Sequence, residues 1–524
     1  MIGNPGIDLH ALAPEIVLSA TVLLVLVVDA FLPARRAWLG MPLALLGVLG
    51  ALAATLTLVG STRSAFDGSF VVDDFALLFK ILFLVLGVLV LLLSLRYVRE
   101  GRYYQGEYYV LLLTAFLGCT MMPSSRNLLT LFLSLELVSA PGFLMAAFRK
   151  TDPRSNEAGL KFFLIGVLST AVMLYGMSLV YGLAGTLDLR GIGQAFAAPL
   201  DGGREALALA SILFIVAGFA FKVSAVPFQF WAPDTYEGSP VPVAAFLATA
   251  SKAAGFAGLL QVMFVAFPAQ HAFWAPVFAA LSIATMTIGN LVALQQRQVV
   301  RLLAYSGIGQ AGYILLPFAL ASGDATLNGA AFSASVTYIL IYSVMTVGAF
   351  AVVTALAGES RGLLIEDLAG LGRRSPLLAV AMTTFMVALA GVPPTAGFWA
   401  KLFVFSAAID RGGIGIALAI AMVLNSVIAL AYYLSVPRAM MFQPPTTDRA
   451  FRAPALVRVV AVAAVVAVLV VAPVARAADP AVFTGAGAWV GWIGLPSVLL
   501  WASAAGLSLV FGLLVMAAER LFRR

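Results

Sequence analysis

The chain has 524 residues, of which 62% are hydrophobic and 10% are charged, and its formal net charge at pH 7 is +7. A water-soluble domain of this length needs a polar surface that this composition does not supply, so the sequence predicts an all-α polytopic membrane protein. The single cysteine, Cys119, excludes an internal disulfide, cysteine-ligated zinc and iron–sulfur clusters. His10 and His271 stand far apart and no nucleotide-binding motif follows a strand pattern, so we expect no metal and no cofactor in this chain.

Apolar runs of about 20 residues, long enough to cross a bilayer, recur along the whole chain. The first run has no basic stretch before it and no small-residue cleavage site after it, so we interpret it as a span rather than a signal peptide. We expect spans near residues 15–33, 41–60, 75–96, 108–123, 127–147, 158–184, 206–226, 240–266, 274–295, 301–320, 328–357, 376–410, 414–440, 455–474 and 496–519. Residues 1–474 then form one membrane domain, and residues 475–524 form a loop, an additional transmembrane helix and a basic tail.

The positions of lysine and arginine predict the orientation, because cytoplasmic loops of membrane proteins collect these residues. Basic residues follow the odd-numbered spans, as at Arg35 and Arg36, Arg149 and Lys150, and Arg373 and Arg374. We therefore expect a bacterial-type inner membrane protein with its N-terminus outside and its C-terminus in the cytoplasm. The same distribution accounts for the net charge without a nucleic-acid partner.

Four charged residues interrupt apolar spans, where each costs about 2.5–3.5 kcal/mol at a helix centre. They are Glu136 in the fifth span, Lys222 in the seventh, Lys252 in the eighth and Lys401 in the twelfth. One carboxylate cannot neutralise three ammonium groups. Burial disfavours the charged form of a lysine and a nearby carboxylate favours it, so movement of a partner can load or unload a proton. The set favours proton transfer, while a structural ion pair or a lysine reaching the headgroups is the alternative for any one member.

Two proline-rich segments predict interruptions of helices at membrane depth, which survive only where the backbone is buried or lines a wet cavity. One contains Pro227 and follows Lys222, and the other contains Pro393 and Pro394 and precedes Lys401. In each, a proline follows a valine and a Phe–Trp pair comes next, and the two lie about five spans apart. This pattern is typical of transporters built from two halves of opposite orientation, although a proline kink used only for packing is the alternative.

Several segments together resemble the antiporter-like subunits of respiratory complex I, and specifically the NADH-quinone oxidoreductase subunit N family. The resemblance extends to about Pro473 and rests on residues 71–80, 106–109, 226–238 and 303–306, on Glu136, and on the second break with Lys401. It implies a 14-helix antiporter-like core with two inverted five-helix repeats and discontinuous helices, to which this chain adds the span near 496–519. It also implies that Glu136 pairs with Lys222, that Lys252 is the central relay and that Lys401 faces the exit half-channel.

Two residues depart from the family, which usually has histidine at their positions. They are Gln229 and Gln310. Glutamine can orient water but cannot take up a proton near neutral pH. We therefore expect waters held by Gln229, Gln310, Tyr305 and Ser306 to connect Lys252 with Lys401, with the lysines carrying the charge.

The resemblance implies a proton-translocating membrane-arm subunit of an NADH:quinone oxidoreductase. Flavin, iron–sulfur clusters and quinone are then expected in partner subunits, and the partners include a second antiporter-like subunit, small hydrophobic subunits and the lipid bilayer. The alternatives are a subunit of a cation/proton antiporter or of a membrane-bound hydrogenase-type complex, which would use the same buried residues without NADH oxidation. A third possibility is a structural scaffold that only closes the membrane arm.

Overall fold

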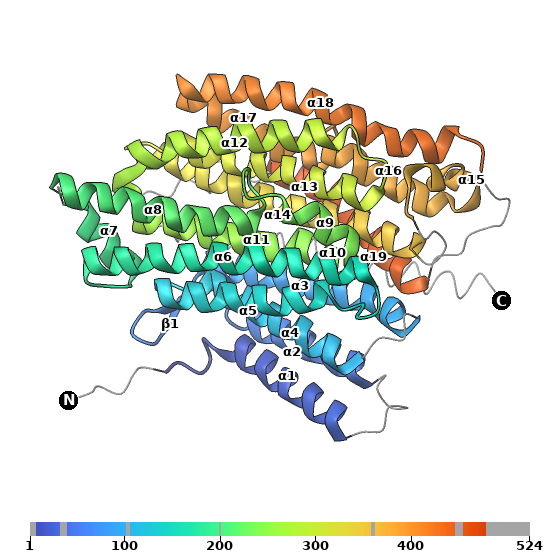
Figure 1. Ribbon diagram of the computed structural model, residues 1–524, viewed down its shortest axis with the longest axis horizontal. Helices are drawn as coiled ribbons and strands as arrows, with labels where there is room; N and C mark the ends of the chain where they lie inside the picture. Colours follow the sequence, from blue (N-terminus) through green and yellow to red (C-terminus); the bar gives the residue numbers. More distant parts are fainter. Residues whose placement is uncertain are drawn as a thin grey trace.

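The computed structural model describes residues 7–31, 39–100, 105–198, 201–357, 362–445 and 454–477. Long helices run side by side with similar axes, as expected for a chain that crosses a bilayer many times (Figure 1). Ten helices among the described residues are long and apolar enough to span a membrane. The span expected at 496–519 and the basic tail lie outside the described residues.

The first half of the chain contributes eight of the expected spans. Its helices are α1 (Ala13–Phe31), α2 (Gly40–Leu56), α3 (Asp74–Glu100), α4 (Gln105–Met121), α5 (Leu128–Ala146), α6 (Pro153–Ala184), α7 (Leu189–Ala197), α8 (Gly202–Val223), α9 (Trp231–Gly238), α10 (Val241–Phe246) and α11 (Lys252–Gln261), with the short turn η2 (Met122–Ser124). The π-helical turn η3 (Leu247–Ser251) joins α10 to α11, and a second π-helical turn, η4 (Val262–Ala266), continues α11, so that these elements form one continuous span. The expected spans up to 240–266 each coincide with a helix.

The second half contains the remaining expected spans that fall on described residues. Its helices are α12 (His271–Ala293), α13 (Val299–Leu315), α14 (Ala325–Leu356), α15 (Leu371–Arg374), α16 (Pro376–Ala390), α17 (Ala396–Arg411), α18 (Ile414–Phe442) and α19 (Ala455–Ala477), with the short turns η5 (Pro268–Gln270), η6 (Leu316–Leu320) and η7 (Ile365–Leu368). The span expected at 376–410 is divided into α16 and α17, and the one at 206–226 stops at Val223 and is followed by α9. The prediction of discontinuous helices is confirmed.

Several short elements between the spans were not predicted from the sequence, and a hairpin and a helix in the first half are two of them. A hairpin of β1 (Arg63–Ala65) and β2 (Phe70–Val72) joins α2 to α3 and pairs antiparallel. The helix α7 lies between α6 and α8. Both lie in connections between spans, where the 20-residue apolar pattern gives no information.

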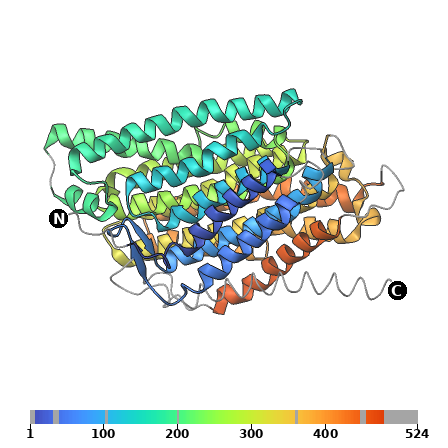
Figure 2. The same ribbon diagram turned by 90° about the horizontal axis from the view of Figure 1, so that it is seen from below.

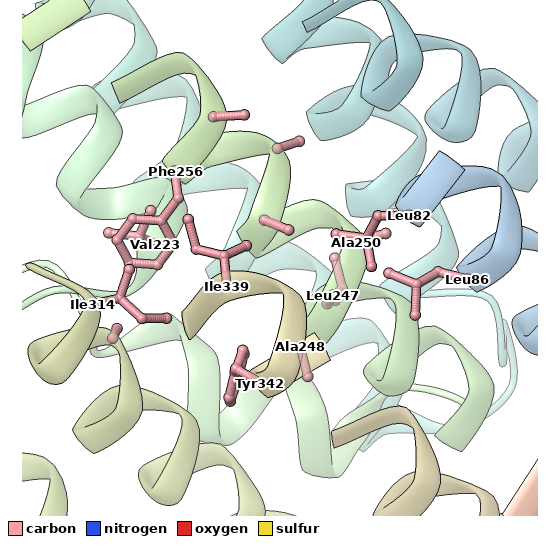
Figure 3. Close-up of a cluster of buried hydrophobic side chains, with 14 of the residues drawn as sticks. Leu82, Leu86, Val223, Leu247, Ala248, Ala250, Phe256, Ile314, Ile339 and Tyr342 are labelled. Atoms are coloured by element: carbon pink, nitrogen blue, oxygen red, sulfur yellow. The ribbon is translucent and has the colours of Figure 1, made fainter. Parts of the chain in front are cut away.

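The core lies along the continuous helix from Val241 to Ala266 and along α14, which are buried on nearly all sides. Side chains of η3 and α11 pack there against α3, α8, α13 and α14 (Figure 3). The residues labelled in this cluster are Leu82, Leu86, Val223, Leu247, Ala248, Ala250, Phe256, Ile314, Ile339 and Tyr342. The helices α1, α6 and α18 lie at the periphery and expose many large apolar side chains. Seen from below, the N-terminal helices and α19 share one face, which agrees with the packing of α3 on α19 (Figure 2). An apolar outer surface over a fully packed centre is suited to lipid.

Candidate functional site

The first helix break separates α8 from α9. The peptide bond before Pro227 is cis, and Pro227 has no N–H to donate. The backbone N–H of Val226 donates to Thr285 Oγ1 of α12 over 3.0 Å, and Trp231 Nε1 donates to the carbonyl of Phe221 over 3.1 Å. Side chains therefore satisfy backbone groups that a continuous helix would satisfy itself, and the irregular segment is stable inside the protein.

Lys222 lies one turn before this break and is buried. Its Nζ donates to Ser139 Oγ of α5 over 2.9 Å. Glu136, one turn before Ser139 on the same helix, is half-buried, and its Oε1 has no hydrogen-bond partner among the described residues. Within the described ranges no salt bridge joins Glu136 to Lys222, so the expected pairing is not a direct contact here.

Lys252 begins α11 immediately after the π-helical turn η3, and its side chain is 1% exposed. Its Nζ donates to the carbonyl of Gly307 in α13 over 2.9 Å. A π-helical turn inside an α-helix is rare and is frequent at functional sites. The sequence placed Lys252 inside a span, and the structure adds that this span is locally widened just before it.

The second break separates α16 from α17. Gly391 ends α16 with a φ of 84°, a left-handed conformation that favours glycine, and the peptide between Pro393 and Pro394 is cis. Such an end leaves carbonyl groups of the last helical turn without backbone partners. The carbonyl groups of Leu389 and Ala390 are among them, and both accept hydrogen bonds from site side chains.

Lys401 is 8% exposed and is bound by neutral groups. Its Nζ donates to the carbonyl of Ala390 over 2.9 Å and to Ser426 Oγ of α18 over 3.1 Å. The same Nζ lies 4.7 Å from the ring centroid of Tyr313, within the range of a cation–π contact. In the described part of the chain Lys401 has no salt bridge, and neither do Lys222 and Lys252.

Gln310 of α13 lies between the central lysine and the second break. Its Nε2 donates to the carbonyl of Leu389 over 2.9 Å and to the Tyr433 hydroxyl over 2.9 Å, and its Oε1 accepts from the Tyr338 hydroxyl over 2.6 Å. The Tyr433 hydroxyl also hydrogen-bonds Ser306 Oγ over 2.5 Å. Gln310 and Ser306, which the sequence analysis grouped, therefore meet in one buried cluster with two tyrosines that it did not identify.

The other two members of that group lie elsewhere. Gln229 sits in the first break, is 7% exposed, and has no partner for its Oε1 among the described residues. Tyr305 is half-buried, and its side chain makes no hydrogen bond to a described residue. The expectation that waters held by these four residues connect Lys252 with Lys401 stays a prediction. Among the four, the structure brings Gln310 and Ser306 to a common partner, the Tyr433 hydroxyl.

A second buried charged group was missed. Lys80 of α3 is 0% exposed and forms a salt bridge with Glu15 of α1. Nearby, Asp73 forms a salt bridge of 2.5 Å with Arg126, whose guanidinium also donates to Gln261 at the end of α11. Lys80 was visible as a charge in an apolar run, but its partner is 65 positions away, and only the packing of α1 identifies it.

Comparison with known proteins gives consistent results. The family described as NADH:quinone oxidoreductase/Mrp antiporter, transmembrane, matches residues 125–429. The NADH-quinone oxidoreductase subunit N of Trichlorobacter lovleyi is 42% identical over 444 residues, covering 84% of this chain and 88% of that protein. A chain of respiratory complex I from Thermus thermophilus, solved with bound aureothin, is 33% identical with a TM-score of 0.73, covering 88% of this chain and 96% of that chain. A chain of an archaeal membrane-bound sulfane sulfur reductase is 21% identical with a TM-score of 0.79, covering 95% of this chain and 99% of that chain, and so shows the fold alone.

Proposed function

Since the chain belongs to the NADH:quinone oxidoreductase/Mrp antiporter family, and within it to the NADH-quinone oxidoreductase subunit N group, we propose that it is a membrane-arm subunit that translocates protons. Redox chemistry in other subunits drives this transport. We expect no cofactor in this chain, and its own contribution is a set of buried groups that gain and lose protons.

The observation that supports proton transfer is the chemistry around Lys222, Lys252 and Lys401. Their Nζ atoms bind hydroxyl or carbonyl oxygens over 2.9 to 3.1 Å. A carboxylate partner would lose its ion pair whenever the lysine gave up its proton. A neutral oxygen can accept a hydrogen bond from either an ammonium or an amine, so the lysine can change its charge without losing its position. These contacts permit repeated protonation.

The helix breaks support the same proposal. Each break lies within a few residues of a lysine, and in α16 the freed carbonyl groups bind Gln310 and Lys401 directly. A change in the geometry of this break would change the partners of both side chains at once. Conformational change driven by the rest of the complex can thereby alter the proton affinity of Lys401.

The expected partners are those that the family implies, and the expected orientation comes from the positions of lysine and arginine. We expect a second antiporter-like subunit and small hydrophobic subunits beside this chain, in a bacterial inner membrane, with the N-terminus outside. The alternatives are a cation/proton antiporter subunit, a class that the family description includes, or a subunit of a membrane-bound hydrogenase-type complex. Relatives more than 40% identical carry the subunit N name, and this favours the NADH-linked complex.

The test uses the assembled complex in sealed vesicles, with NADH oxidation and proton uptake measured together. Lys252→Met and Lys401→Met should each abolish the protons that this subunit contributes, because methionine keeps the apolar stem and carries no proton. The matched control is Lys150→Met, which changes a lysine whose side chain is 59% exposed. Unchanged pumping in both buried variants would contradict the proposal. Proton uptake driven by a sodium gradient without NADH would favour the antiporter alternative.

The scaffold alternative makes a different prediction for Glu136. If the subunit only closes the membrane arm, Glu136→Gln leaves proton pumping unchanged while the complex assembles normally. If the subunit translocates protons, that variant lowers pumping, because the carboxyl group near Lys222 is the one acidic member of the proposed set.

A further inference from the structure

The ring of Tyr313 makes a contact with Lys401 that distinguishes a charged lysine from a neutral one. Lys401 Nζ lies over this ring, 4.7 Å from its centroid. The π face of an aromatic ring attracts a cation and has no such attraction for a neutral amine. The Ala390 carbonyl and Ser426 Oγ, which bind the same Nζ, accept a hydrogen bond from either form. The ring therefore favours the protonated lysine.

Contacts from three other helices fix the position of this ring. Tyr313 is fully buried, and its hydroxyl accepts from Asn290 Nδ2 of α12 over 3.0 Å. Asn290 is itself held by α18, because its Nδ2 also donates to the Asn425 carbonyl over 3.2 Å and its Oδ1 accepts from the Tyr432 hydroxyl over 3.0 Å. The Tyr338 ring of α14 stacks on Tyr313 at 26°, with the centroids 6.3 Å apart.

The helix that carries the ring is also packed closely on α12. A Cβ atom added at Gly309 of α13 would lie 2.6 Å from Asn290 Oδ1, and one added at Gly312 would lie 2.5 Å from the backbone nitrogen of Met286. Both distances are too short for a larger residue, so glycine permits this approach. The ring of Tyr313 is therefore part of a rigid unit of α12 and α13.

Lys401 belongs to a different unit, the half-helix α17. Residues 391–395, which form the second break, separate α17 from α16. Segments between two half-helices are the places where one half can shift relative to the rest of a protein. A rearrangement of this break would move Lys401 relative to the ring of Tyr313, which stays with α13.

The other lysines of the proposed set lack such a contact. In the described part of the chain, no aromatic ring lies over the Nζ of Lys222 or of Lys252. Lys80 lies 4.9 Å from the centroid of the Phe70 ring, but it also has a carboxylate partner. Within the proposed transport set, the charge-dependent aromatic contact is thus specific to Lys401.

We propose that the Tyr313 ring retains the proton on Lys401 until the second helix break moves this lysine off the ring. Over the ring, Lys401 is held as the ammonium. Away from it, the neutral oxygen partners favour neither form, and the ammonium gives its proton to water and becomes a neutral amine. This inference rests on the proposed function and deepens it, because it identifies the lysine that keeps its proton at rest and the contact that keeps it there.

The test varies the electron density of the ring in the assembled complex in sealed vesicles. The readout is the ratio of protons pumped to NADH oxidised, measured as a function of pH. Tyr313→Phe keeps the π face and should keep the wild-type profile. Tyr313→Leu removes the ring, so the pH at which the ratio is half of its maximum should fall by about one unit, a tenfold loss of proton affinity. Tyr313→Phe with one, two or three fluorine atoms on the ring should lower this pH stepwise, because each fluorine withdraws electrons from the π face while the shape of the side chain stays nearly the same.

The other groups around Lys401 do not titrate in the range of the test, about pH 6 to 8. The elements packed against α17 are α14, α16, α18, α19 and η6. Their titratable side chains are tyrosines and arginines, which keep their protons in this range, and α17 itself adds an aspartate and an arginine at its far end. The residues are Tyr338, Tyr342, Tyr432, Tyr433, Arg438, Arg458, Arg476, Asp410 and Arg411.

The ring over Lys80 provides the matched control. Phe70 with the same fluorine atoms weakens a cation–π contact of similar length beside a lysine outside the proposed transport set, and should leave the profile unchanged. An equal shift in the Phe70 series overturns the inference. So does a fluorinated Tyr313→Phe series that assembles and keeps the wild-type profile, and this series decides the question even if Tyr313→Leu fails to assemble.

The outcomes separate this inference from the proposed function. If Lys401→Met abolishes the protons contributed by this subunit and the fluorinated series has no effect, the proposed function stands and the role of Tyr313 fails. If Lys252→Met and Lys401→Met both pump normally, the proposed function fails whatever the ring of Tyr313 does.

Discussion

The salt bridge between Glu15 and Lys80 offers a test of how the peripheral helix α1 is held. Lys80 is 0% exposed and its ammonium lies 4.9 Å from the ring centroid of Phe70, while Glu15 is 7% exposed. Glu15→Gln removes the only carboxylate that pairs with Lys80 among the described residues. The variant leaves a buried ammonium group with a neutral partner.

The expected magnitude follows from the burial of both groups. Removing one partner of a buried ion pair costs about 3–5 kcal/mol because the other charge is left uncompensated. Glutamine keeps a carbonyl that can accept a hydrogen bond from Lys80, so we expect about 3 kcal/mol, at the lower end. The double variant Glu15→Gln with Lys80→Met removes both charges of this pair, and replacing a whole buried pair by neutral groups often changes the stability little. It should therefore be more stable than Glu15→Gln alone.

The assay is thermal inactivation of the purified complex, with the amount of intact complex measured after heating. Single and double variants form a cycle whose coupling term isolates the pair. The expected order of stability is wild type, then the double variant, then Glu15→Gln. The reasoning is refuted if Glu15→Gln is as stable as the wild type, or if the double variant loses as much as the two single variants together.

Two further predictions concern the partners of functional lysines, and a third concerns the salt bridges that hold α9. Ser139→Ala removes the hydroxyl that accepts from Lys222 and should lower pumping while assembly, measured by native gel electrophoresis, stays normal. Ser426→Ala removes one of two hydrogen bonds to Lys401, worth about 0.5–1.5 kcal/mol, and should slow pumping by up to about tenfold, whereas Ser426→Thr keeps the hydroxyl and should retain activity. Arg301→Gln breaks salt bridges of 2.7 and 2.8 Å to two carboxylates of α9, and limited proteolysis should then cut near α9 faster than in the wild type.

The helical fold could be predicted because a bilayer imposes a simple rule on the sequence. About 20 apolar residues must follow one another in each span, and each expected span before residue 475 coincides with a helix or a pair of half-helices. The breaks could be predicted from prolines that cluster beside a buried lysine, since proline removes a backbone hydrogen bond. Proline alone is not sufficient, because Pro141, Pro276 and Pro437 lie inside continuous helices. Neither rule applies to the hairpin of β1 and β2, because its short strands follow from local turn geometry and from packing against η2.

The site could be predicted only in part. Charge in an apolar run identified Glu136, Lys222, Lys252 and Lys401, because insertion of a charge is costly wherever it occurs. The hydrogen-bond partners of these residues could not be predicted from the sequence. Lys222 and Ser139 are 83 positions apart, and no periodicity in the sequence connects α5 with α8. Serine is common in membrane helices, so its presence alone marks no site.

The tyrosines of α18 show why part of the buried polar cluster around Gln310 was not predicted from the sequence. Tyr432 and Tyr433 stand in an apolar run and are consistent with ordinary packing. The Tyr433 hydroxyl hydrogen-bonds Ser306, 127 positions away, and the Tyr432 hydroxyl donates to Asn290, 142 positions away. Sequence analysis placed the proton path on residues with strong individual signals. A hydrogen-bonded cluster of residues that are common in membrane helices cannot be identified from the sequence pattern.

The four buried lysines fall into two classes, and this division decides which of them can serve transport. Lys80 has a carboxylate partner. Deprotonation of Lys80 would break this ion pair and leave the buried Glu15 charged without a partner. Lys222, Lys252 and Lys401 have hydroxyl and carbonyl partners that tolerate either protonation state. A protein that needed these three only for stability would gain more from carboxylates beside them, since an unpaired buried charge is the costly arrangement. Their neutral hydrogen-bond partners therefore favour a role in which the lysine gains and loses its charge, whereas the salt bridge of Lys80 with Glu15 favours a role in holding α1.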